Sequence, residues 1–187
     1  MAKGGGFEIK VARMFTKWVT GKEKPEIVWR SISLGPKATM DRRRGGEIRK
    51  IGDLVAIDPK GQWIEDTFFI ECKHHRKADL MDLMKNNSSK NKTNVRNWWL
   101  KCKRESEEAS KYPLLVFHGD NQPIMAMADN DMFRELNVLG HLTHYFFYKE
   151  KRDPGALAIL NPVAVLFLFE ELLNILDPKT VEAVLRK

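Results

Sequence analysis

Cysteine is scarce in this sequence of 187 residues, in which only Cys72 and Cys102 occur. Two cysteines make no disulfide framework, and such low usage fits a reducing compartment. The first ten residues contain no apolar segment of the kind found in secretory signals. The most apolar run, residues 163–169, is far too short to span a bilayer. We therefore expect a cytoplasmic protein that does not enter the membrane.

The motifs of several large enzyme classes are also missing. The sequence has no Walker A loop and no dinucleotide-binding glycine pattern, so neither ATP nor NAD is implied. It has no CxxC pair and no HExxH motif. The spacing of His141 and His144, and the cluster of Cys72, His74 and His75, are too weak to predict a zinc site.

Charge of one sign is in excess. The chain has 32 lysines and arginines against 25 acidic residues, which gives a net charge of +7 and a pI of about 9.4. This surplus favours a polyanionic partner, with nucleic acid as the leading candidate. A protein that is merely basic would have the same composition, so charge alone does not decide. The length predicts a single domain over residues 1–187.

The most informative part of the chain runs from residue 48 to residue 75. Residues 51–57 are apolar and β-branched with one carboxylate, Asp53, and a second apolar run covers residues 67–73. Asp-Pro-Lys-Gly turn chemistry lies between them, so the pattern predicts a β-hairpin. Because side chains alternate along a strand, Glu71 and Lys73 share one face. The pair is either an ordinary exposed ion pair or, with Asp53, a metal site.

Gly52-Asp53 followed by Glu71-Cys72-Lys73 resembles the PD-(D/E)XK nuclease superfamily. The resemblance implies an α/β fold with a restriction-endonuclease-like core, a central mixed β-sheet flanked by helices. It implies that Asp53, Glu71 and the backbone carbonyl of Cys72 bind Mg²⁺, for which Mn²⁺ can substitute, and that Lys73 positions the attacking water. Carboxylate and carbonyl oxygens suit this hard cation. Gly52 stands where the family pattern has proline, a position that carries no chemistry.

A first helix is predicted over residues 7–20, where apolar residues recur every three or four positions and Gly21 follows as a stop signal. Glu8 lies at the edge of its apolar face. In the resemblance, Glu8 matches a glutamate on the first helix that joins the metal site in many of these nucleases, Holliday junction resolvases among them. The alternative is a solvated glutamate favoured by the helix dipole.

Basic side chains predict where DNA would lie. The strand over residues 26–34 carries an Arg-Ser pair that resembles the resolvase pattern, and the loops 41–50 and 85–97 are rich in Lys and Arg. Arginine donors match phosphate geometry, although charged loops are often merely solvated. The predicted DNA-binding residues are Arg30, Ser31, Arg42, Arg43, Arg44, Lys90, Lys92 and Arg96.

The remaining pattern predicts alternating helices and strands. We expect a helix over residues 98–111, with Trp98 and Cys102 facing the core and Trp99 doing so only in part. Strands are expected at residues 113–118, 123–128, 143–148 and 155–160, and a short helix at 129–139. Residues 161–176 predict a helix that is apolar on most sides, hence buried or a homodimer interface. The nuclease core would cover about residues 1–128, with the remainder completing the sheet and adding helices.

These observations predict a Mg²⁺-dependent DNA endonuclease. The best finer prediction is a Holliday junction resolvase-like enzyme of DNA recombination or repair. Three alternatives stay open: a restriction- or repair-type nuclease of the same superfamily, a non-catalytic DNA-binding module with this fold, and a protein-interaction scaffold that uses the apolar helix.

Overall fold

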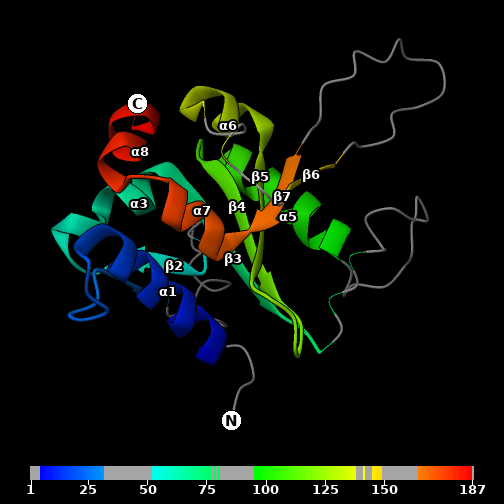
Figure 1. Ribbon diagram of the computed structural model, residues 1–187, viewed down its shortest axis with the longest axis horizontal. Helices are drawn as coiled ribbons and strands as arrows, with labels where there is room; N and C mark the ends of the chain where they lie inside the picture. Colours follow the sequence, from blue (N-terminus) through cyan, green and yellow to red (C-terminus); the bar gives the residue numbers. More distant parts are fainter. Residues whose placement is uncertain are drawn as a thin grey trace, which may run out of the picture.

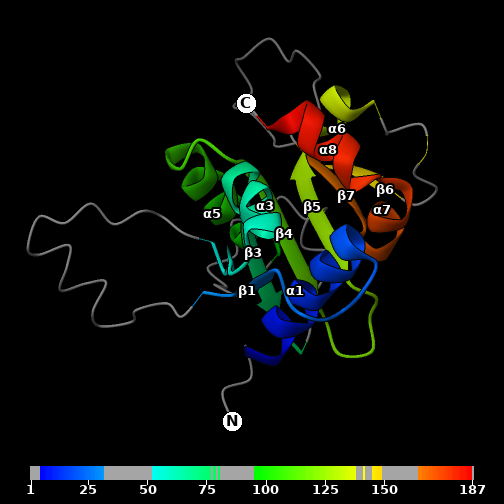
Figure 2. The same cartoon turned by 90° about the vertical axis from the view of Figure 1, so that its left-hand side faces the viewer.

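Helices cover both faces of one β-sheet (Figures 1 and 2). The computed structural model describes residues 5–31, 52–76, 78, 80, 95–137, 141, 145–148 and 164–186. No helix in these ranges is long and apolar enough to cross a membrane. The predicted α/β class, with a mixed sheet between helices, is confirmed.

The sheet has five strands in the described part of the chain, in the order β3-β4-β5-β7-β6. The edge strand β3 runs parallel to β4, and all other neighbours are antiparallel. The strands are β3 (Phe68–His74), β4 (Tyr112–His118), β5 (Met125–Asp129), β7 (Ala164–Leu168) and β6 (Tyr145–Tyr148). Strands were therefore predicted correctly at 113–118, 123–128 and 143–148, and the one predicted at 155–160 lies outside the described residues.

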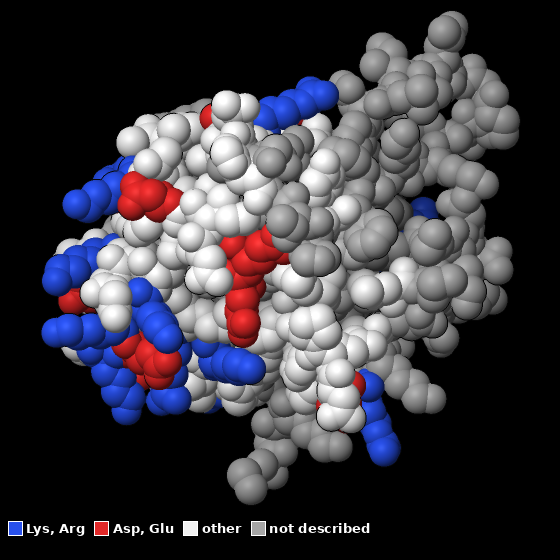
Figure 3. All heavy atoms as spheres, in the orientation of Figure 1, with Lys and Arg blue, Asp and Glu red and all other residues white. Residues whose placement is uncertain are grey.

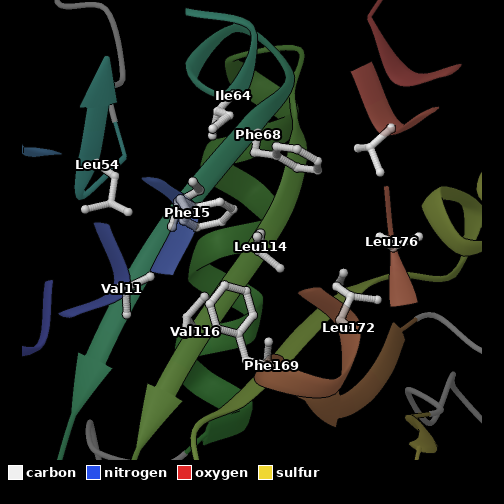
Figure 4. Packing of buried hydrophobic residues seen from close by; sticks show 14 of the residues in the cluster. Val11, Phe15, Leu54, Ile64, Phe68, Leu114, Val116, Phe169, Leu172 and Leu176 are labelled. Atoms are coloured by element: carbon white, nitrogen blue, oxygen red, sulfur yellow. The ribbon is translucent and has the colours of Figure 1, made fainter. Parts of the chain in front are cut away.

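Two apolar layers hold the helices on the sheet. Alternate residues of β3, such as Phe68 and Ile70, pack toward Phe15, while Phe69 packs toward Trp99 on the opposite face. Figure 4 shows the first of these layers. One face of the sheet carries α1 (Gly5–Thr20), α6 (Asn130–Leu136), α7 (Phe169–Ile175) and α8 (Pro178–Leu185), and the other carries α5 (Val95–Glu108).

The predicted hairpin is wrong. β2 (Leu54–Ala56) pairs with β1 (Val28–Arg30), and two helical segments separate it from β3. These are η1 (Pro59–Gly61) and α3 (Gln62–Thr67). Asp58 accepts a hydrogen bond from the Lys60 backbone N–H at 2.9 Å, so Asp-Pro here starts a helix instead of making a turn. Trp63 and Ile64 then bury the inner side of α3.

The apolar run near residue 165 was also misassigned. Ala164–Leu168 is strand β7, which lies between β5 and β6, and helix α7 begins only at Phe169. A strand buried on both faces has a continuous apolar sequence, which looks like a helix buried all round. Because Val165 and Phe167 are fully buried within the chain, the argument for a dimer interface on an apolar helix no longer applies.

The tryptophans of α5 belong to the core. Trp98 is 8% exposed and Trp99 is fully buried, so the prediction that Trp99 would be buried only in part is wrong. Cys102 is buried as predicted. The first helix is confirmed: α1 ends at Thr20, and Gly21 follows with φ of 73°. These helices therefore set the walls on both sides of β3.

Candidate active site

Asp53 lies against the free edge of strand β3. Its backbone N–H donates to the Ile70 carbonyl at 2.7 Å, and its carboxylate oxygen Oδ2 accepts from the Cys72 N–H, also at 2.7 Å. The backbone and side chain of Asp53 together satisfy the groups that an adjacent strand would have paired. The predicted proximity of Asp53 to β3 therefore holds, although a hairpin does not produce it.

Gly52 permits this close approach. A Cβ atom at position 52 would lie 2.5 Å from the Ile70 carbonyl oxygen and 2.8 Å from its nitrogen. Both atoms are backbone and cannot rotate away, so only glycine fits. Gly52, which replaces the proline of the family pattern, is thus the residue that packs directly against the backbone of β3.

Glu71 and Lys73 project from β3 on the face that α5 covers, one residue on either side of Cys72. The Lys73 ammonium Nζ lies 2.5 Å from Glu71 Oε1 and 3.6 Å from Asp53 Oδ2. It also donates to the Cys72 carbonyl oxygen at 3.3 Å. Two carboxylates and one carbonyl thus surround a single cationic atom.

A second ammonium reaches the same carboxylate from α5. Lys101 Nζ lies 2.9 Å from Glu71 Oε1 and 3.5 Å from Glu105 Oε2. Lys101 was not predicted as a site residue. The one signal in the sequence was its neighbour Cys102, whose core-facing position places Lys101 at the rim of the helix interface.

The pKa values of the two carboxyl groups move in opposite directions. Burial, followed by the negative charge of Glu71, raises the pKa of Asp53 from 3.8 to about 6, and Lys73 only partly opposes this. Burial also acts to raise the pKa of Glu71, but the ammonium groups of Lys73 and Lys101 hold it below its usual value. The pKa of Lys73 is raised because the charges of Asp53 and Glu71 outweigh its burial. Burial and the neighbouring Glu71 therefore make the ionised form of Asp53 unfavourable in this cluster.

Glu8, the remaining predicted metal ligand, lies near this cluster. Its negative charge is one of the causes that raise the pKa of Asp53, which places it near that carboxylate. In the part of the chain that the structure describes, no three His, Cys, Asp or Glu side chains are grouped to hold a metal ion. Glu8 is half-buried on α1, in the first turns of the helix.

Two of the predicted DNA-binding residues border the site. The Ser31 backbone N–H donates to the Asp53 carbonyl at 2.7 Å. The exposed Arg30 guanidinium lies against Gly5 at the start of α1. A Cβ atom added to Gly5 would be 2.3 Å from Arg30 Nη1. The backbone at the end of β1 therefore adjoins Asp53, and Arg30 lies between this strand and the start of α1.

The other predicted DNA contacts are less closely placed. Arg96 lies in the first turn of α5, whereas Arg42, Arg43, Arg44, Lys90 and Lys92 lie outside the described residues. Residues 32–51 contain six lysines and arginines against two acidic residues, and residues 81–94 contain three against one. On the face in Figure 3, blue and red side chains are interspersed on the left, and an acidic patch lies near the centre. Most of the basic surplus thus belongs to two segments that flank the site residues in sequence.

The donor set fits a hard divalent cation. Asp53 Oδ2, Glu71 Oε1 and the Cys72 carbonyl are all oxygen donors, and all lie within 3.6 Å of the Lys73 ammonium. Mg²⁺ takes oxygen ligands and commonly uses one or two carboxylates together with water and phosphate. The same two acidic residues and lysine that the sequence singled out are therefore together in space.

A mixed sheet with an Asp…Glu-x-Lys cluster on its edge strand is the arrangement of the PD-(D/E)XK nuclease class. The model of one family in that class, described as "Phage putative PDDEXK endonuclease", matches residues 1–174. Since this match covers most of the chain, the protein belongs to that family. No curated protein and no solved structure matches the chain at a significant level. The family description names an endonuclease and specifies no DNA structure.

Proposed function

We propose that the protein is a divalent-metal-dependent endodeoxyribonuclease. The supporting observation is the convergence of three oxygens, from Asp53, Glu71 and Cys72, on one cationic atom. These oxygens would hold Mg²⁺ or Mn²⁺. When bound, the ion would lower the pKa of a water molecule and neutralise charge on the phosphate.

The side chains around these oxygens have separate roles in the proposal. Lys73 orients the attacking water and stabilises negative charge on the phosphate, because its ammonium already lies at the point where the oxygens meet. Glu8 binds the ion through a water molecule. Its charge acts on Asp53, but among the described residues it does not form a group of three ligands with the two carboxylates. Hydrolysis by water needs no covalent intermediate with the protein.

DNA is the proposed substrate. The Ser31 backbone bonds to Asp53, Arg30 pairs with the adjacent Leu54, and the basic segments 32–51 and 81–94 adjoin the site in sequence. Together with Glu8, the Arg-Ser pair favours a four-way junction, as in resolvases of recombination and repair. Restriction- and repair-type nucleases share the same cluster, so fold and cluster alone do not choose among DNA structures.

The proposal is tested by incubating labelled four-way junction, flap, duplex and single-stranded DNA with Mg²⁺, with Mn²⁺ and with EDTA. We expect cleavage of at least one substrate with metal and none with EDTA. Binding that weakens with salt, without cleavage of any substrate, would identify a non-catalytic DNA-binding module. An absence of DNA binding at moderate salt would favour a protein-interaction scaffold.

Cation binding should depend on pH through Asp53. A cation requires the deprotonated carboxylate, and the pKa of Asp53 is about 6, so the affinity for Ca²⁺ should fall about tenfold per pH unit below that value. Isothermal titration calorimetry between pH 5 and pH 8 would measure this change. Equal affinities at pH 5 and pH 8 would contradict the assignment of Asp53 as a ligand.

The metal-free protein should respond to pH in the opposite direction. The pKa of Asp53 is about 6 when folded and 3.8 in its unperturbed form, so the folded state binds the proton more tightly between these values. The contribution of Asp53 to the free energy of unfolding should therefore increase as the pH falls through about 6. Thermal unfolding in EDTA across this range would show it.

A further inference from the structure

Glu71 has two ammonium partners on one oxygen. Lys73 and Lys101 lie 2.5 and 2.9 Å from Glu71 Oε1, although this side chain is only 5% exposed. Lys73 comes from the same strand, whereas Lys101 comes from α5 and extends over the rim of that helix. Half of the Lys101 side chain is exposed, so one side of its ammonium faces Glu71 and the other faces solvent.

Two carboxylates and two ammonium groups meet at the centre of this cluster. Asp53 and Glu71 supply two negative charges when ionised, and Lys73 and Lys101 supply two positive charges. A divalent cation held by the two carboxylates would weaken the attraction of Glu71 for both ammonium groups and leave them able to contact a phosphate. Attack of hydroxide on a phosphodiester gives a pentacovalent transition state with two negative charges. Two ammonium groups beside the ion could therefore stabilise the added negative charge.

We propose that Lys101 is a second active-site lysine, which neutralises Glu71 in the metal-free protein and contacts the scissile phosphate during cleavage. This inference rests on the proposed nuclease function and adds a catalytic residue to it. Glu105 supports the assignment, because its carboxylate lies 3.5 Å from the Lys101 ammonium and keeps it at the rim of the site. The solvent-facing side of Lys101 is the side from which DNA would approach.

The test compares Lys101→Met with the wild-type protein by two measurements. Single-turnover cleavage in Mg²⁺ should slow about 100-fold, as for the loss of one preorganised transition-state donor. Ca²⁺ affinity, measured by calorimetry without DNA, should be equal or tighter, because a positive charge near the ion is removed. Lys101→Arg keeps the positive charge, so its single-turnover cleavage should be faster than that of Lys101→Met.

Each outcome decides the role of Lys101. Unchanged cleavage in Lys101→Met would overturn the proposal, and so would a parallel loss of cleavage and Ca²⁺ binding, which indicates that Lys101 only orients Glu71. If Lys101→Met does not fold, Lys101→Gln serves with the same criteria. The matched control is Lys103→Met on the same helix, whose ammonium pairs with Asp129 at 3.6 Å outside the site and whose loss should change neither measurement. A wild-type protein that binds no cation refutes the nuclease proposal itself.

Discussion

Asp53→Asn is expected to abolish metal-dependent cleavage and to make the metal-free protein more stable. Asparagine has nearly the same shape and can still accept the Cys72 N–H, but it removes one of the two proposed anionic ligands. We expect Mg²⁺-dependent cleavage to fall by at least about 1000-fold, while DNA binding at low salt is largely kept. Cleavage assays and binding assays on the same substrate would measure the two effects.

The stability of this variant tests the electrostatics independently of activity. At pH 8 the ionised Asp53 is destabilising in the metal-free fold, because its pKa is raised to about 6. Asp53→Asn should therefore increase the free energy of unfolding in EDTA by about 1 to 3 kcal/mol. Asp58→Asn, which alters the half-buried cap of η1, is the control and should leave cleavage unchanged. Normal cleavage by Asp53→Asn would remove Asp53 from the active site.

Gly52→Ala is expected to damage both the fold and the site. The new Cβ would meet the Ile70 backbone at 2.5 Å and would force Asp53 away from β3. We expect a loss of about 2 to 4 kcal/mol in the free energy of unfolding, from overpacking and from a broken backbone hydrogen bond. Cleavage should fall about 100-fold or more, because Asp53 would move relative to Glu71.

Gly6→Ala provides the comparison for this substitution. Gly6 lies in α1, and a Cβ there would have nothing within 4 Å, so the variant should be as stable as the wild type or more stable by up to about 1 kcal/mol. Chemical denaturation would compare the two variants directly. A Gly52→Ala protein that unfolds and cuts like Gly6→Ala would show that the edge of β3 tolerates a side chain at this point.

The parts of this structure that were predictable depend on local patterns. The alternation along β3 places Glu71 and Lys73 on one face whatever strand lies next to them, because the period of two belongs to the strand itself. The spacing of apolar residues in α1 defined that helix in the same way. Both predictions needed only neighbours in sequence.

The parts that were missed depend on tertiary neighbours. Asp53 was expected beside β3, but the way it is held there was missed: its side chain accepts a backbone hydrogen bond from β3, which no alternation pattern reveals. Lys101 reaches Glu71 only because α5 packs across β3, 30 residues further along the chain. The strand β7 was taken for a helix because burial on both faces removes the polar residues that distinguish the two periods. Pattern reasoning fails where a residue's partner is far away in sequence.

The lysine held between the two carboxylates has a consequence for how this protein is made in the cell. Lys73 acts as a tethered counterion to both carboxylates, so we expect the chain to reach its native structure without a metal ion. Zinc fingers, by contrast, remain unfolded until their ion binds. Under the proposed function, folding and activation by the ion would therefore be separate steps, and the protein would be folded before the ion binds.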